Sequence, residues 1–325
     1  MKLHENEIEF KQLVTLASSE FGIADVLIEK DYWVTFALRN LSKSGVAQKV
    51  VFKGGTSLSK AHKLIFRFSE DIDLAVIVEE GTSDNAVNKV LKAIEAACVT
   101  GFTAVTDDPR ESKKGRFRKT IWKFPKTALT GSYGDAGENI LIEVNSFTTP
   151  EPHADMEIDS LIAEYLKVSK QESIITEYNL EPFRIAVLRA ERTFVEKISA
   201  ITKGSHLSQD GSYEMLKKNI RHFYDLSKLF DKVGISILQD KAKLLELLTW
   251  VKRDDKKMDP KGEWADKEYK TASIYENFDE VWSKLSSSYN GQFKDMLYGK
   301  ETLPKEDKVK ETVLAIGKAL KEYEE

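Results

Sequence analysis

Two aspartates separated by one apolar residue, Asp71 and Asp73 around Ile72, are the side chains of this sequence best suited to chemistry. They open the apolar run DIDLAVIV, which predicts a β-strand from residue 71 to residue 78. Side chains alternate between the two faces of a strand, so both carboxylates point the same way and Ile72 points to the other face. Two carboxylates on one face repel each other unless a cation lies between them. The pair therefore predicts a metal site.

A short segment upstream combines glycines with hydroxyl residues, after an apolar strand expected over residues 50–52. Its members are Gly54, Gly55, Thr56 and Ser57. Glycine lets the backbone approach a ligand closely, and a helix capped by Thr or Ser presents free N–H groups to an anion. We expect these four residues to hold the β- and γ-phosphates of a nucleotide, at the start of a helix over residues 57–63.

A third carboxylate comes from a later strand, predicted from Asn139 to Phe147 (NILIEVNSF). Glu143 shares a face of that strand with Leu141 and Asn145, inside an apolar segment. A buried carboxylate without a partner is costly, so Glu143 requires a cation, hydrogen bonds or solvent at a cleft. Glu143 is therefore the candidate third ligand of the metal site.

The predicted chemistry is nucleotidyl transfer from a nucleoside triphosphate (NTP) substrate to an acceptor hydroxyl. Mg²⁺ prefers oxygen ligands and retains waters, so two or three carboxylates suffice for a two-ion site. Asp71 and Asp73 are the expected Mg²⁺ ligands, with Mn²⁺ as the alternative ion, and Glu143 would complete the attacking side and help deprotonate the acceptor. The glycine segment is not a Walker loop, because no Gly-Lys-Ser/Thr follows four intervening residues.

The elements around these residues mix helices and strands in the first half of the chain. Helical spacing of apolar residues covers residues 6–20, 23–42 and 85–99, and a further strand is expected at residues 102–105. The pattern predicts an α+β fold with a mixed sheet. Pro150 and Pro152 mark a break, after which the apolar spacing turns helical.

The predicted domains are residues 1–165, which carry the nucleotidyl-transfer site, and residues 166–325, which are mostly helical. The expected helices of the second domain cover residues 183–203, 213–231, 237–252, 274–300 and 306–323. The highly charged segment 253–273 reads as an exposed loop.

Residues 110–126 form the one markedly basic stretch, with aromatic residues interleaved. The stretch reads as a long strand or as the arm of a hairpin. Two interpretations are open: a solvated face of the sheet, or a wall that meets a triphosphate or an RNA backbone.

Composition limits the possible classes of protein. The 325 residues suffice for two domains and are 41% hydrophobic, so the chain can bury a core. The net charge of −4 argues against a protein that coats nucleic acid but permits a local RNA contact. The single cysteine, Cys98, cannot form an internal disulfide and fits a small core residue. Without an apolar signal core or a membrane-length run, we expect a cytoplasmic protein with no membrane partner.

Four segments resemble the AbiEii/AbiGii family of nucleotidyltransferases, within the DNA polymerase β superfamily. They are EKDYW from Glu29, KGGTSL from Lys53, RFSEDIDL from Arg67, and the pair Glu196-Lys197 followed by RHFYDL from Arg221. The RFSEDIDL run, which contains Glu70, is the most specific of the four. Taken alone, EKDYW reads equally well as a solvated acid–base pair beside a packed aromatic.

The resemblance implies a polymerase β-like nucleotidyltransferase domain, a helical C-terminal domain and a cleft between them. Members are toxins of abortive-infection and type IV-like toxin–antitoxin pairs, opposed by an antitoxin that is often a winged-helix protein. In studied cases they transfer nucleotides to RNA, at the 3′ ends of tRNA. Residue by residue, Asp71 and Asp73 match the metal acids, Lys197 a lysine that contacts nucleotide phosphates, and Asp225 an acid required for activity. The third acid is less uniform in the family, and Glu143 in place of Asp adds a methylene.

Without the resemblance, the residues of the second domain give weaker indications of function. Lys197 reads as an exposed helix lysine when only its spacing is considered. Asp225 lies among apolar residues at helical spacing, where an acid is often the buried partner of a base, and Lys197 is the obvious candidate for that base.

Two other functions would use parts of the same site. A protein NMP-transferase would keep the acids and modify a Ser, Thr or Tyr side chain. A non-catalytic nucleotide-binding regulator would bind NTP without transfer, but a binder has no need for three acids at positions 71, 73 and 143.

Overall fold

The computed structural model describes residues 2–69, 71–127, 129, 131–208, 210–298 and 301–323. Glu70 of the RFSEDIDL run lies outside the described residues. The chain forms two compact units, each described here by itself. The first comprises Met1–Ser146, His153–Val187 and Tyr298–Glu301, and the second comprises Phe147–Pro152, Leu188–Leu297 and Thr302–Glu325.

The described part of the first unit contains a mixed eight-stranded sheet in the order β3-β5-β6-β2-β1-β8-β7, with β4 paired to β5. The strands are β1 (Val50–Lys53), β2 (Asp71–Val76), β3 (Thr103–Ala104), β4 (Ser112–Lys114), β5 (Phe117–Lys123), β6 (Ile140–Asn145), β7 (His153–Ile158) and β8 (Phe183–Leu188). Strand β2 runs antiparallel to β1 and parallel to β6, while β1 runs parallel to β8. The predicted α+β fold with a mixed sheet is confirmed.

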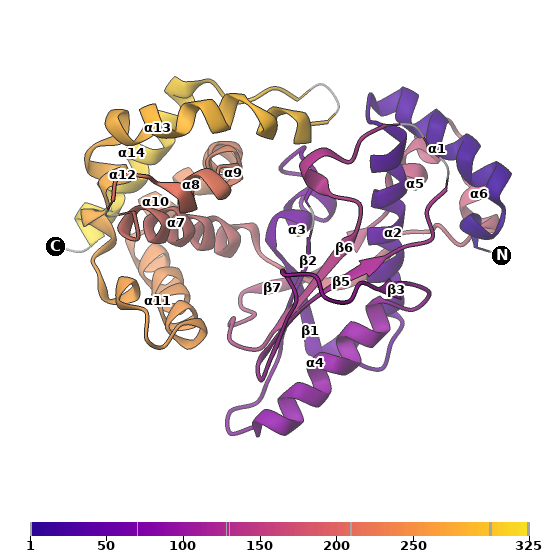
Figure 1. Ribbon diagram of the computed structural model, residues 1–325, viewed down its shortest axis with the longest axis horizontal. Helices are drawn as coiled ribbons and strands as arrows, with labels where there is room; N and C mark the ends of the chain where they lie inside the picture. Colours follow the sequence, from indigo (N-terminus) through magenta and orange to yellow (C-terminus); the bar gives the residue numbers. More distant parts are fainter. Residues whose placement is uncertain are drawn as a thin grey trace. The chain divides into compact units, whose positions relative to one another are not determined.

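Helices pack around this sheet (Figure 1). They are α1 (Glu7–Phe21), α2 (Asp25–Ser42), α3 (Gly54–Lys60), α4 (Asp84–Cys98), α5 (Leu161–Val168) and α6 (Glu172–Glu177). Apolar residues of α2 and α4 bury one face of the sheet, on which Ile72, Leu74 and Ile142 are fully buried. This burial fixes the register of β2, because a slip by one residue would turn its apolar side chains to the other face.

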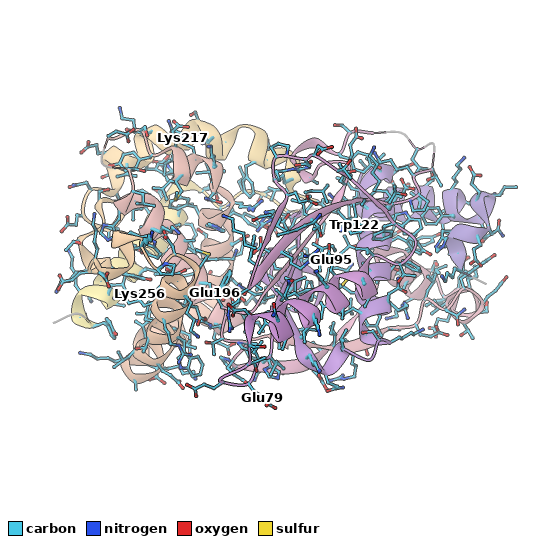
Figure 2. The ribbon with its side chains drawn as sticks, turned by 60° about the horizontal axis from the view of Figure 1, so that its bottom comes forward. Glu79, Glu95, Trp122, Glu196, Lys217 and Lys256 are labelled. Atoms are coloured by element: carbon cyan, nitrogen blue, oxygen red, sulfur yellow. The ribbon has the colours of Figure 1, made fainter. Side chains whose placement is uncertain are left out.

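One charged contact also lies on this covered face. Arg118 of β5 points toward α4, where its Nε lies 2.5 Å from Oε2 of Glu95. Figure 2 labels Glu95 together with Trp122, which shares the face of β5 with Arg118. Side chains at the positions between these residues therefore point to the opposite face of the sheet. That opposite face carries the candidate site.

The EKDYW segment lies in α2 and is buried. Glu29 and Lys30 are 0% and 1% exposed. Glu29 accepts hydrogen bonds from N and Oγ1 of Thr127 at 2.7 and 2.8 Å, and Lys30 donates to backbone carbonyls of the turn before β6. Asp31 lies 2.5 Å from the ammonium group of Lys60 in α3. The interpretation as a solvated pair is wrong: the three charged side chains attach three separate segments to one helix.

The second unit is helical in its described residues, as predicted. Its helices are α7 (Ala190–His206), α8 (Glu214–Lys218), α9 (Arg221–Leu229), α10 (Ile235–Gln239), α11 (Lys241–Met258), α12 (Ser273–Glu276), α13 (Phe278–Asn290) and α14 (Glu306–Tyr323). Buried Arg192 of α7 lies 2.7 Å from Asp254 of α11, which also accepts from the backbone N–H of Thr149. Segment 147–152 is thereby attached to the helices of this unit. Among the described helices of the whole chain, none has the length and apolar character needed to cross a membrane.

Two predicted elements of the second half of the chain are wrong. The helix expected from residue 183 begins only at Ala190, because Phe183–Leu188 form β8 and Val187 pairs with Phe52 of β1. After β7 and β8, the second unit resumes at Leu188; residue 165, where the division into two domains was predicted, lies inside α5. The segment 253–273 is not an exposed loop, since α11 extends through its first residues and two of its aromatic side chains are buried.

Candidate active site

Four charged side chains lie in register across four neighbouring strands of the first unit. Lys53 of β1 is opposite Asp73 of β2, Asp73 is beside Glu143 of β6, and Glu143 is opposite Lys119 of β5. Residues in register on adjacent strands share a face, so these four side chains form one line, here called the charged row. Each of the four is partly exposed. The row places two carboxylates between two ammonium groups.

Asp71 lies on the same face, two residues before Asp73. Ile72 between them is fully buried on the other face, which confirms the expected alternation. Thr56 of α3 donates a hydrogen bond to the Asp71 carbonyl at 2.5 Å and so holds the backbone of the strand. Within the described part of the chain, the buried Oδ1 of Asp71 has no hydrogen-bond partner. A buried carboxylate oxygen in this state is a strong acceptor for a cation or a donor.

Gly54 is required where α3 begins. Its φ is +77°, a left-handed conformation, and a Cβ added there would lie 2.1 Å from Oδ2 of Asp73. The helix starts at Gly54 and has no Thr or Ser cap, so the predicted start at residue 57 is wrong. Thr56 and Ser57 lie inside the helix, and Ser57 donates to the Gly54 carbonyl at 2.8 Å. The two hydroxyls therefore donate to backbone carbonyls, of Gly54 within the segment and of Asp71 in β2.

Gly55 makes a second close approach. A Cβ at this position would lie 2.8 Å from Nη2 of Arg67, a side chain that is 1% exposed. The Arg67 guanidinium also donates to the Phe68 carbonyl at 3.0 Å. Each glycine therefore allows one charged side chain to pack against the backbone: the Asp73 carboxylate at Gly54 and the Arg67 guanidinium at Gly55. Sequence reasoning missed the role of Arg67, although it opens the RFSEDIDL run.

Glu143 is paired with a lysine. Its Oε2 lies 3.6 Å from Nζ of Lys119, and its side chain is 24% exposed. Burial raises the pKa of the Glu143 carboxyl, while the ammonium groups of Lys119 and Lys53 oppose that rise. Sequence reasoning identified Glu143 but missed Lys119, which was one of several cations in the basic stretch. The signal was its spacing of two residues from both Phe117 and Ile121, which puts it on their face of the strand, opposite Arg118.

The donors suit a divalent cation only in part. Among the described residues, no group of three or more His, Cys, Asp and Glu side chains is placed to hold a metal ion. Mg²⁺ is commonly held by one or two carboxylates together with substrate phosphates. Asp71 and Asp73 satisfy that smaller requirement, and the unpartnered Oδ1 of Asp71 supplies a free ligand atom. The fit therefore favours the two aspartates, with Glu143 engaged by Lys119.

Lys197 and Asp225 form a buried ion pair within the second unit. Nζ of Lys197 lies 2.5 Å from Oδ2 of Asp225, and the two side chains are 6% and 0% exposed. Nδ1 of His222 lies 3.5 Å from the same ammonium group. The expectation that Asp225 has Lys197 as its partner is confirmed, and the exposed-lysine interpretation is wrong. The pair joins α7 to α9.

The basic stretch forms a hairpin of β4 and β5, as expected. Most of its cations have acidic partners: Arg116 lies 2.8 Å from Asp84, and Arg118 is bound to Glu95. Lys119 belongs to the charged row instead. The cations are thus divided between two faces of the sheet and do not form a single wall.

A mixed sheet with two aspartates on one strand, beside a helix that opens with glycine, is an arrangement that suits nucleotidyl transfer. The chain matches the model of the family described as nucleotidyl transferase AbiEii toxin, type IV toxin–antitoxin system, over residues 37–312, and it belongs to this family.

Two solved structures are similar to the chain. MenT4, a nucleotidyltransferase toxin from Mycobacterium tuberculosis H37Rv, has 16% identity and a TM-score of 0.45, with 92% of each chain covered. JHP933 from Helicobacter pylori has 16% identity and a TM-score of 0.43, with 91% of this chain and 94% of that chain covered. No curated protein gives a significant match.

Proposed function

We propose that this nucleotidyltransferase transfers a nucleoside monophosphate from a Mg²⁺-bound NTP to a hydroxyl of RNA, with the 3′ end of tRNA as the expected acceptor. The observation that carries the proposal is the charged row, with Asp71 beside it and the glycine-opened helix α3 against Asp73. Phosphate recognition and metal-binding carboxylates are the two requirements of this chemistry, and both lie at the same end of β1 and β2.

The proposed reaction breaks a phosphoanhydride bond of the NTP and forms a phosphoester bond to the acceptor. The acceptor oxygen bonds to the α-phosphorus as the bond from that phosphorus to its bridging oxygen breaks, and pyrophosphate leaves. Asp71 and Asp73 would hold Mg²⁺, which would offset the developing negative charge. Gly54, Gly55, Thr56 and Ser57 would hold the phosphates through backbone N–H groups.

Glu143 is the proposed acceptor of the proton from the attacking hydroxyl. Its raised pKa makes it a stronger base than a solvated carboxylate, which favours this role over direct metal binding. Lys197 is proposed to contact the nucleotide phosphates. Asp225 is proposed to orient the side chain of Lys197. The proposal includes a cytoplasmic location and a cognate antitoxin, with a winged-helix protein as one possible form.

A labelled-NTP screen tests the acceptor. The protein is incubated with Mg²⁺ and each α-labelled NTP, together with total RNA or with lysate protein, and the two fractions are then separated. We expect label in RNA from at least one NTP. Label found solely in protein would replace the RNA acceptor by a Ser, Thr or Tyr side chain, and binding without transfer to either fraction would indicate a regulator.

Gly54→Ala should strongly reduce transfer. A methyl group 2.1 Å from Oδ2 of Asp73 must displace that carboxylate, and the left-handed backbone adds strain of about 1–3 kcal/mol. Loss of a positioned charged group typically costs about 10²–10³ in rate. Gly45→Ala is the matched control, because nothing lies within 4 Å of its added Cβ. Transfer by Gly54→Ala at the rate of Gly45→Ala would disprove the close fit.

Lys119→Ala should lower kcat/KM roughly tenfold, equivalent to about 1.4 kcal/mol of transition-state stabilisation. The variant removes an ammonium group 3.6 Å from Glu143 and one of the two cations of the charged row. Lys114→Ala, an exposed lysine of β4 in the same hairpin, is the control and should stay within threefold of wild type. Equal kinetics for the two variants would exclude Lys119 from the site.

A further inference from the structure

A pocket of about 250 Å³ lies in the first unit, separate from the charged row. It is built on one side of α2, where Tyr32, Phe36, Arg39 and Lys43 recur at helical spacing. Figure 1 shows α2 beside α5; the other side of the pocket is formed by Ser160, just before α5, and by residues 178–180, just after α6. Four of its lining residues precede residue 37, where the match to the family begins, so the pocket is formed in part by sequence outside that match.

The walls of the pocket are aromatic. The rings of Tyr32 and Phe36 are stacked at 6.4 Å between centroids with an interplanar angle of 19°. The hydroxyl of Tyr32 is bonded to His4 Nδ1 at 2.7 Å, and that of Tyr178 accepts from Asn6 at 3.1 Å. Both phenols are thus fixed by bonds outside the pocket, and their rings present rigid flat surfaces. Such surfaces suit a planar ring.

The charged side chains that line the pocket are all positive, although Glu181 and Asp159 lie near enough to act on Arg39. The charged lining residues are Lys2, Arg39 and Lys43, and among the described residues that line the pocket none is acidic. The carboxyl end of α2 contributes only about half a negative charge, less than one of the three cations supplies. The lining therefore favours an anionic ligand.

Arg39 is the most constrained of these cations. It is half-buried, and burial lowers the pKa of its guanidinium. One nitrogen donates to the Glu181 carbonyl at 2.6 Å, and the guanidinium carbon lies 4.7 Å from the Phe183 ring centroid. No carboxylate in the described part of the chain forms an ion pair with it. The guanidinium is held in place, and its other N–H groups can donate to a ligand. A fixed guanidinium with several N–H donors is well suited to bind phosphate.

The amide of Asn40 gives an independent indication. It lines the pocket, and its Nδ2 is buried without a hydrogen-bond partner among the described residues. Buried donors without partners are rare in folded proteins, so this one suits an acceptor on a ligand. The volume is somewhat below the 300–1,000 Å³ that is typical of small-molecule pockets, which limits the ligand to about one nucleotide.

We propose that this pocket is a second nucleotide site, which binds a nucleoside monophosphate with its base against the aromatic rings and its phosphate on Arg39 and Lys43. The site needs neither Asp71 nor Asp73. It stands independently of the proposed transfer reaction, and its failure would leave that reaction untouched.

Calorimetry in EDTA tests the site, because chelation removes metal-dependent binding at the charged row. The probes are AMP, GMP, CMP and UMP, with the matching uncharged nucleosides and inorganic phosphate for comparison. We expect at least one monophosphate to bind about tenfold or more tightly than its nucleoside and than phosphate. Asp71→Asn should bind it as wild type does.

Three variants locate the binding. Arg39→Ala should weaken it at least tenfold, and Lys43→Ala, an exposed side chain whose loss leaves the fold intact, should weaken it severalfold. Lys49→Ala, an exposed lysine that does not line the pocket, should not change it. The proposal is overturned by wild-type binding in Lys43→Ala and Arg39→Ala, by loss of binding in Asp71→Asn, or by no monophosphate binding more tightly than phosphate.

Discussion

Asp71→Asn and Asp73→Asn should each reduce NMP transfer by about 10³-fold or more, the largest effect on activity that we expect from any single substitution. The amide keeps the size of the side chain but removes the charge that would hold Mg²⁺. Asp71 would lose the carboxylate whose Oδ1 has no partner in the described part of the chain, and Asp73 the carboxylate that packs against Gly54. Rates are measured with α-labelled NTP.

The stability of these variants should stay close to that of wild type. Asp73 lies beside Glu143 on the neighbouring strand, and like charges in register destabilise a sheet by up to about 1 kcal/mol. Removing one charge relieves that repulsion but also ends the attraction to Lys53 on the other side, so the melting temperature of Asp73→Asn should stay close to that of wild type. Asp84→Asn, an exposed acid of α4, is the control and should retain transfer. Transfer by Asp73→Asn at the rate of Asp84→Asn would remove Asp73 from the mechanism.

Asp225→Ala should produce the largest loss of stability, about 3–5 kcal/mol. The substitution leaves the Lys197 ammonium group buried without a carboxylate that lies 2.5 Å away in the native structure. The pair connects α7 to α9, so thermal unfolding of the second unit should shift downward by roughly 6–20 °C. Scanning calorimetry measures this shift directly.

Asp231→Ala is the control variant. It shows how much stability is lost when an exposed ion pair, and not a buried one, is removed. Asp231 lies 2.8 Å from Lys308, but its side chain is 58% exposed, and such pairs contribute about 0–1 kcal/mol. The double variant Lys197→Met/Asp225→Leu should recover most of the stability, since apolar residues of similar size replace buried pairs well, yet it should not recover transfer. A melting temperature for Asp225→Ala equal to that of Asp231→Ala would show that the buried pair does not stabilise the unit.

The local pattern around Asp71 and Asp73 was sufficient to predict their geometry. Strict alternation puts both acids on one face, and the apolar residues between and after them could only turn to the core. The pairing of Lys197 with Asp225 was also predictable, because a buried acid in a helix requires a base. Both inferences depend on a single element or on one strong energetic constraint.

Features that depend on pairing between distant segments were not predictable. Phe183–Leu188 has apolar residues at spacings that fit a strand and a helix alike. Only its pairing with β1 makes this segment a strand, β8. The charged row needs the register of four strands, which no single segment encodes. The charged residues of EKDYW looked solvated because their partners, such as Thr127 and Lys60, are remote in sequence.

The most direct test of the central claim compares α- and γ-labelled NTP in the presence of RNA and Mg²⁺, with wild type and Asp73→Asn. Nucleotidyl transfer moves the α-phosphorus to the acceptor and releases the γ-phosphorus in pyrophosphate. We therefore expect wild type to transfer the α label to RNA and leave the γ label in solution, and Asp73→Asn to transfer neither. Transfer of the γ label to the acceptor, or undiminished α-label transfer by Asp73→Asn, would contradict the account.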